Sequence, residues 1–178
     1  NCIACHTPPQ FTDHRLHNTG VSQAEYDALF GAGAFAALEV PGLVDRNIRP
    51  QAYLPASIEH PNALSRFRSA PSKDQPGFAD LGVWNIFANA DFPKPQKALT
   101  TILCDASALT SSRCTPDVLL PLTIALFKTP SIRDPGHSDP YFHSGTAATL
   151  EEVLKFYMEA SELARAGRLR NGSPEVRA

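Results

Sequence analysis

The sequence predicts a helical protein whose helices are separated by long, proline-rich loops. Of the 178 residues, 16 are proline, nearly twice the usual ~5% share, and they are spread from Pro8 to Pro174. Because proline interrupts helices and sheet ladders, much of the chain is expected to be irregular. The most regular segment follows Thr149, where apolar residues recur with the spacing of an amphipathic helix.

The length and composition are those of an ordinary globular protein. A chain of 178 residues is long enough for one domain with a real core, or for two very small ones. Hydrophobic residues make up 43% and charged residues 19%, and the formal net charge is -2. A charge this small and mixed does not favour nucleic acid or an acidic membrane surface as a partner. No apolar stretch approaches the ~20 residues of a membrane helix, so no membrane span is predicted.

Two earlier segments are also candidates for helices. The first is expected to begin at Ser22, with Glu25 completing a capping box. Residues 39–79 are rich in proline without a sustained period, so they are predicted to be mostly loop. Residues 81–90 are a short apolar helix candidate that carries Trp84, for which we expect a place in the core.

The final helix is expected to begin after Thr149. Glu152 stands at the capping-box position. Acidic residues occupy the first turn, where their negative charge interacts favourably with the positive end of the helix dipole. Its apolar residues are predicted to form a stripe on one face. The residues of this stripe are Leu150, Val153, Leu154, Tyr157 and Leu163.

The strongest chemical signal is the C-x-x-C-H pattern of residues 2–6. Two thiols one helical turn apart can add to the two vinyl groups on one edge of a porphyrin, and the histidine that follows supplies an axial ligand to its iron. We therefore expect one covalently bound haem c, attached through Cys2 and Cys5 and ligated by His6. The chain has no second C-x-x-C-H pattern, so one haem is all it can attach in this way.

Two other functions of these cysteines compete with haem attachment. A thioredoxin-like redox pair would be expected at a helix start after a strand, and we expect no strand before residue 2. A zinc site would combine Cys2 and Cys5 with Cys104 and Cys114. The second pair is separated by nine residues, unlike the short spacing of a zinc knuckle.

Cys104 and Cys114 are predicted to form a disulfide bond. Haem is attached covalently in an oxidising compartment, where two remaining thiols ten positions apart usually pair. Both lie in a stretch rich in Ser and Thr that we expect to be a loop. Free buried thiols are the alternative. The same compartment predicts a periplasmic or extracellular location.

Periodicity favours Tyr157 over Met158 as the second axial ligand of the iron. Adjacent helical residues point about 100° apart, so only one of them can face the iron. Tyr157 falls on the predicted apolar stripe, whereas Met158 shares a face with Glu151 and Lys155. The position could also be open, or it could be filled by a histidine. The candidate histidines are His14, His17, His137 and His143.

Several ordered motifs resemble the C-terminal haem domain of bacterial dihaem cytochrome c peroxidases and of MauG. They are F-K-T-P-S-I-R at 127–133, P-Y-F-H-S-G at 140–145 and T-L-E-E-V at 149–153. The segments F-T-D and L-H-N-T-G, within residues 11–20, resemble the same family. The resemblance covers residues 2–20 and 127–157, and it implies an all-α, cytochrome c-like haem domain that passes electrons to a second haem in a preceding domain.

The resemblance also implies further site residues. In the peroxidases a methionine of the final helix is the distal ligand, and its position corresponds to Tyr157 here. MauG-like proteins carry tyrosine at this position. The family binds calcium between its two domains through backbone carbonyls that match Ser138 and Pro140. Arg133 matches a basic family position, where it would pair with a haem propionate or a loop carbonyl, unless it only pairs with Asp134 or Asp139.

We therefore predict a single cytochrome c-like domain over residues 1–178, with a long insertion at about residues 39–126 whose role the sequence does not indicate. We expect the chain to be a piece of a longer protein. Its predicted partners are a second haem domain or subunit and a redox partner protein. One hypothesis is the electron-transferring haem domain of a peroxidase/MauG-like oxidoreductase. The other is a non-catalytic monohaem carrier or a structural subunit of a larger cytochrome assembly.

Overall fold

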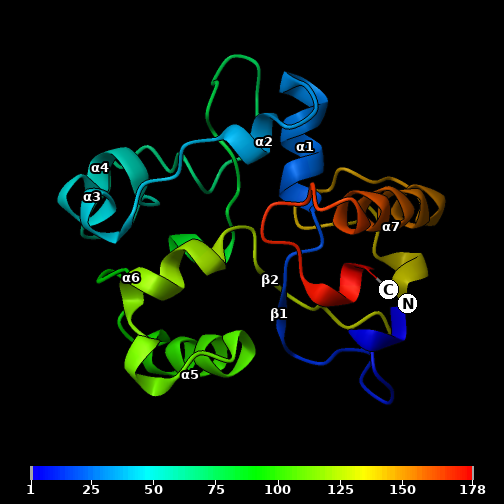
Figure 1. The fold of residues 1–178 in the computed structure, drawn as a ribbon. Coiled ribbons are helices and arrows are strands. Elements are labelled where there is room, and N and C mark those ends of the chain that lie inside the picture. Colours follow the sequence, from blue (N-terminus) through cyan, green and yellow to red (C-terminus); the bar gives the residue numbers. More distant parts are fainter. Residues whose placement is uncertain (1, 178) are drawn as a thin grey trace. The chain divides into compact units, whose positions relative to one another are not determined.

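The computed structural model describes residues 2–177, which fold as two compact units. Unit 1 comprises residues 2–37 and 127–177, and unit 2 comprises residues 38–126. The bounds of unit 2 are nearly those of the predicted insertion. The described chain is mostly helical, with one small two-stranded sheet that the all-α prediction did not include (Figure 1).

Unit 1 contains the C-x-x-C-H motif and the longest helix. Its elements are η1 (Cys2–Ala4), β1 (Leu16–His17), α1 (Val21–Phe30), α2 (Ala34–Ala37), β2 (Phe127–Lys128), η5 (Pro135–His137), α7 (Leu150–Arg165) and η6 (Pro174–Arg177). The two strands are antiparallel, with Leu16 opposite Lys128 and His17 opposite Phe127. This pairing ties the segment after the haem motif to the second part of the unit.

Asn18 joins the early and the late parts of unit 1. Its backbone N–H donates to Ser173 Oγ at 2.8 Å, and its side-chain amide donates to the Arg170 carbonyl at 2.8 Å. The Asn18 carbonyl accepts from the Ser173 N–H at 3.0 Å. Asn18 Oδ1 also accepts from the Gly20 N–H at 2.9 Å. A buried polar side chain satisfied in this way fixes the backbone on both sides of it.

Helix α7 begins as the sequence predicts. Thr149 Oγ1 accepts from the Glu152 N–H, and the Glu152 carboxylate accepts in return from the Thr149 N–H, which completes the capping box. The predicted apolar stripe is partly wrong, because Leu150 and Leu154 are 41% and 59% exposed. The buried face is formed instead by small and aromatic residues that pack against η6. These are Phe156, Ala160 and Ala164, in contact with Leu169 and Val176.

Helix α1 begins differently from the prediction. Its N-cap is Gly20, and Ser22 lies buried inside the first turn and makes no cap. Gly20 has a φ of +93°, and a Cβ there would lie 2.8 Å from the Leu169 side chain. Glycine is required at this position for both reasons. Glu25, assigned to the capping box from the sequence, instead accepts hydrogen bonds from Ser144 and Thr146.

Unit 2 consists of short helices around an aromatic core. Its elements are α3 (Leu43–Ile48), α4 (Pro50–Tyr53), η2 (Val83–Asn85), α5 (Gln96–Ser107), η3 (Ser111–Arg113), α6 (Pro116–Leu119) and η4 (Leu120–Thr123). The helix predicted over 81–90 is only the single turn η2, and α3 and α4 lie where loop was predicted. Trp84 is fully buried, as predicted, and its ring meets that of Phe67 edge-on at 5.0 Å.

Cys104 and Cys114 form the predicted disulfide bond, with their Cα atoms 5.7 Å apart. Cys104 lies on α5, however, and not in a loop. The bond ties the end of α5 to the segment that leads into α6. It also leaves neither sulfur for a zinc site with Cys2 and Cys5, so that alternative is wrong.

Arg46 is a fully buried cation at the centre of unit 2. Its guanidinium lies 5.0 Å from the centroid of the Trp84 ring and donates to three backbone carbonyls, those of Trp84 at 2.7 Å, Phe87 at 2.9 Å and Ala88 at 2.7 Å. Burial lowers the pKa of Arg46 to about 10. The carbonyl oxygens compensate the buried charge, because each directs the negative end of its dipole at the guanidinium.

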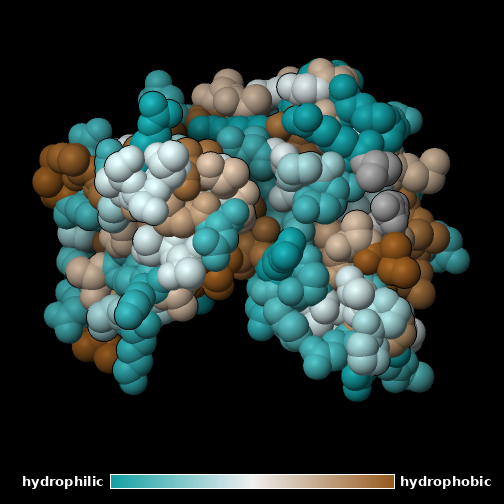
Figure 2. Space-filling model, turned by 60° about the horizontal axis from the view of Figure 1, so that its bottom comes forward, coloured by the Kyte–Doolittle hydropathy of each residue, from teal (hydrophilic) through white to brown (hydrophobic). Residues whose placement is uncertain are grey.

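Figure 2 shows one face of the molecule, where hydrophobic residues form separate patches among hydrophilic ones. Helix α7 contributes three of the exposed large hydrophobic side chains, namely Leu150, Leu154 and Met158. Among residues 2–177, no helix is both long enough and apolar enough to span a membrane.

Replacing Arg46 by methionine is expected to lower the free energy of unfolding by ~2–4 kcal/mol, because three buried carbonyls lose their donor. Near-UV circular dichroism of Trp84 during urea unfolding measures this loss. Arg49→Met is the matched control: Arg49 is exposed and only covers the Tyr53 ring, so its loss should be below about 1 kcal/mol. Equal losses in the two variants would contradict the role of Arg46.

Candidate haem-attachment site

One turn of chain brings the residues of the C-x-x-C-H motif together. The N–H groups of Cys5 and His6 donate to the Cys2 carbonyl at 3.3 and 2.9 Å. Both thiols are free, with Cys2 exposed and Cys5 partly buried. The turn therefore presents two unpaired sulfurs and one imidazole within five consecutive residues, which is the donor set that covalent haem attachment requires.

The His6 imidazole is held by one of its two nitrogens. Its Nδ1 lies 3.0 Å from the Phe11 carbonyl oxygen. With Nδ1–H as donor to this carbonyl, Nε2 carries the lone pair. Histidines that bind metals are usually oriented by such a hydrogen bond from the other ring nitrogen. In this tautomer the local fold leaves His6 Nε2 as a free acceptor nitrogen.

Tyr157 lies near the two cysteines. Burial raises the pKa of Tyr157, the charges of Cys5 and Cys2 raise it further, and a hydrogen bond with the Thr19 side chain lowers it. Its ring packs edge-on against that of Phe142, with the centroids 6.3 Å apart. Met158, in contrast, is 69% exposed. Of the two neighbours, Tyr157 is the more buried.

The four other candidate histidines all have partners in unit 1. His14 Nε2 lies 2.6 Å from Gln10 Oε1, and His137 Nδ1 lies 3.1 Å from Asp134 Oδ1. The ring of His143 stacks on Phe127, with the centroids 4.0 Å apart. His17 is engaged at both ring nitrogens, as described next.

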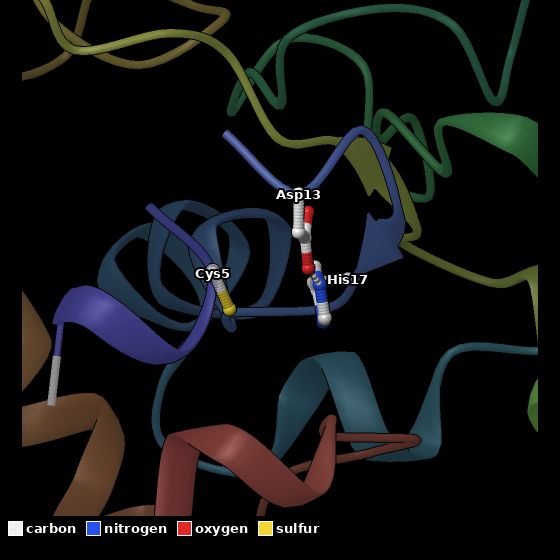
Figure 3. Close-up of side chains that lie close together, drawn as sticks. All are labelled: Cys5, Asp13 and His17. Atoms are coloured by element: carbon white, nitrogen blue, oxygen red, sulfur yellow. Dashed lines mark hydrogen bonds and ion pairs between the residues drawn. The ribbon is translucent and has the colours of Figure 1, made fainter. Parts of the chain in front are cut away.

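His17 and Asp13 form a cluster with Cys5 that the sequence analysis did not predict (Figure 3). The His17 Nε2 atom lies 2.7 Å from Asp13 Oδ2, and Nδ1 lies 3.4 Å from Glu175 Oε2. Cys5 Sγ, an Asp13 carboxylate oxygen and a His17 ring nitrogen lie within 4.8 Å of one another. Asp13 and His17 come from a loop and a two-residue strand, so no periodic pattern could reveal their proximity.

The carboxylates act on the Cys5 sulfur. Burial raises the pKa of Cys5 to about 11, with further contributions from the charges of Asp13 and Glu175. Burial would also raise the pKa of Asp13, but hydrogen bonds from the Arg15 N–H, His17 and Thr129 outweigh it and lower that pKa. Asp13 is therefore held as a carboxylate beside Cys5.

The remaining predicted residues lie on exposed segments of unit 1. Arg133 donates through Nη2 to the Pro9 carbonyl at 3.1 Å, which is the loop-carbonyl pairing among the alternatives considered. Ser138 directly follows η5, Pro140 is the first residue of the P-Y-F-H segment, and both are exposed. Their role as calcium ligands stays a prediction.

The residues of unit 1 fit a haem. Two free thiols and an imidazole with one nitrogen already fixed stand at its motif, and Tyr157 lies close to both cysteines. Large apolar side chains of the same unit are also exposed, among them Ile3 next to Cys2 and Leu154 on α7. A porphyrin is a large apolar surface that would cover such side chains.

Comparison with known proteins gives a partial match. The chain is 51% identical over 37 residues to cytochrome-c peroxidase IdrP1 of Denitromonas iodatirespirans. The match covers 21% of this chain and 10% of that protein, so the chain spans only a small part of its relative. No protein-family model matches the chain, and neither does any solved structure. The similarity supports a relation to cytochrome c peroxidases, without a finer assignment.

The lowered pKa of Asp13 predicts how its contribution to stability depends on pH. A carboxyl whose pKa is lowered by folding stabilises the folded state above its unfolded pKa, ~4, and loses this contribution as the pH falls through the folded pKa. The difference in unfolding free energy between the wild type and Asp13→Asn should therefore be larger at about pH 5.5 than at about pH 2.5. Urea titrations at the two pH values measure it. Asp134 also pairs with a histidine, but its side chain is 75% exposed. The unfolding free energy of Asp134→Asn should therefore differ little from that of the wild type at either pH.

Proposed function

We propose that this chain is a c-type haem domain that transfers electrons within a cytochrome c peroxidase/MauG-like oxidoreductase. The observation that carries the proposal is the turn of residues 2–6, where two free thiols precede a histidine whose Nδ1 is already bound to the Phe11 carbonyl. The partial identity with a cytochrome-c peroxidase supports the same assignment. One haem, attached to Cys2 and Cys5, would supply the redox chemistry.

Attachment needs only groups that the turn presents. Each thiol adds across one vinyl group: sulfur bonds to one vinyl carbon, and a proton is delivered to the other. His6 Nε2 would hold the haem iron, with the orientation of the ring kept by the hydrogen bond between Nδ1 and the Phe11 carbonyl. One short segment would thus hold the edge of the porphyrin through Cys2 and Cys5 and its iron through His6.

Tyr157 is the distal ligand in this proposal. An anionic phenolate donates more charge to iron than a thioether does, so it stabilises the oxidised metal and lowers the reduction potential. Burial and the nearby cysteines disfavour a phenolate that is not bound to metal, whereas coordination to iron would compensate its charge. A tyrosine in this position suits a haem that holds oxidising equivalents better than it suits an easily reduced carrier.

The proposed partners are a second haem domain or subunit and a redox partner protein, in the periplasm or outside the cell. The carbonyls of Ser138 and Pro140 would contribute to a calcium site completed by the partner domain, since backbone oxygens suit this hard cation. Arg133 would face a haem propionate or keep the loop contact it makes with Pro9.

The alternative is a non-catalytic monohaem carrier or a structural subunit of a larger cytochrome assembly. The 37-residue match covers 10% of the peroxidase, and fold or motif similarity does not establish peroxidase activity. A haem count on the native particle separates the two: a second haem together with peroxide reactivity favours the oxidoreductase, and one haem without reactivity favours the carrier.

Covalent attachment is the first test of the proposed function. The haem should resist acid-acetone extraction from the denatured protein and give a pyridine haemochrome spectrum of c type. Replacing Cys2 and Cys5 by alanine should abolish attachment, whereas the matched double variant Cys104→Ser/Cys114→Ser should keep it, because that pair is a disulfide in unit 2. Haem that is extracted from the wild type would contradict the proposal.

The distal ligand is tested by Tyr157→Phe. Loss of the phenolate should free a coordination site, change the visible spectrum of the oxidised haem and raise its reduction potential. Met158→Leu is the control, since this neighbour is exposed and should leave the spectrum as it is. An unchanged six-coordinate spectrum in Tyr157→Phe would exclude Tyr157 and favour the simple carrier.

A further inference from the structure

The cluster of Asp13, His17 and Glu175 is placed where it can act on a haem bound to Cys5. Its members come from the loop before β1, from β1 and from η6, and they meet at the two nitrogens of the His17 ring. His17 is 8% exposed, so the contacts lie largely away from solvent. Figure 3 shows the Cys5 sulfur beside the Asp13–His17 pair.

The cluster is negatively charged in either state of the histidine. A neutral imidazole has a single N–H and can donate to only one carboxylate, which leaves a net charge of about −2. A protonated imidazole donates to both and leaves about −1. His17 holds Asp13 by a hydrogen bond of 2.7 Å, and the Glu175 carboxylate lies 3.4 Å from its other ring nitrogen.

A haem attached at Cys5 would have its porphyrin edge close to the negative charge of the cluster. The sulfur of Cys5 stays in the covalent product, and the porphyrin substituent is joined to it by one bond. Cys5 Sγ already lies within 4.8 Å of both an Asp13 oxygen and a His17 nitrogen.

We propose that Asp13 and Glu175, positioned by His17, lower the reduction potential of the haem attached at Cys5. Reduction adds one electron to the haem, and nearby negative charge that is poorly screened disfavours the added charge. This inference rests on the proposed function, since it requires covalent haem. In this role His17 positions the cluster, and the negative charge of Asp13 and Glu175 favours the oxidised haem over the reduced one.

The test is the midpoint potential of the haem-loaded chain, measured by spectroscopic redox titration at one pH and ionic strength. Asp13→Asn and Glu175→Gln should each raise the potential, because each removes one negative charge. The rise should be larger for Asp13→Asn, since the Glu175 side chain is 34% exposed and partly screened. Glu175→Asp keeps the charge and should stay close to the wild type.

Asp134→Asn is the matched control, because Asp134 forms an exposed Asp–His pair with His137 in the same unit. Its potential should equal that of the wild type. Glu175→Gln keeps the test valid if Asp13→Asn does not fold. Unchanged potentials in both carboxylate variants, with haem still covalently bound, would overturn the role of the cluster alone. Absence of covalent haem in the wild type would overturn the proposed function and this inference together.

Discussion

The arrangement of unit 1 depends on the backbone and side-chain hydrogen bonds of one buried residue, Asn18. It binds the chain just after β1 to residues 170–173, more than 150 positions later. An amide suits this position because it donates to one backbone group and accepts from another at the same time. Without the Asn18 side chain, Gly20 would lose the acceptor that fixes the start of α1, and the Arg170 carbonyl would lose its donor.

Unit 2 is built on a different principle. Its core contains a buried cation and an aromatic ring, and the cation, Arg46, donates to the carbonyls of Trp84, Phe87 and Ala88. The segment around Trp84 contains only a single helical turn, and backbone N–H groups bind its carbonyls at Leu81, Gly82, Val83 and Ile86. Arg46 supplies the donors for the carbonyls of Trp84, Phe87 and Ala88. This is how a proline-rich stretch with little regular structure still forms a buried core.

The sequence predicts those features that depend on local chemistry. The capping box of Thr149, the turn of the C-x-x-C-H motif and the burial of Trp84 each follow from neighbouring residues. Ser22 shows the limit, because it has the same spacing to Glu25 as Thr149 has to Glu152, yet Gly20 in a left-handed conformation starts the helix instead. The stripe on α7 differs because the residues that η6 covers decide which face is buried. The Cys5–Asp13–His17 cluster requires a loop, a strand and a turn to meet, and no single-segment pattern contains that information.

The Asn18 contacts also determine the order in which the protein can be completed. During synthesis the C-x-x-C-H motif emerges before unit 2, but Arg170 and Ser173, which secure the segment behind it, emerge only after the whole of unit 2. Contacts this distant in sequence form slowly, because a long loop must close first. The segment that carries Cys2 and Cys5 is therefore closed by its own unit only after residues 170–173 have been made.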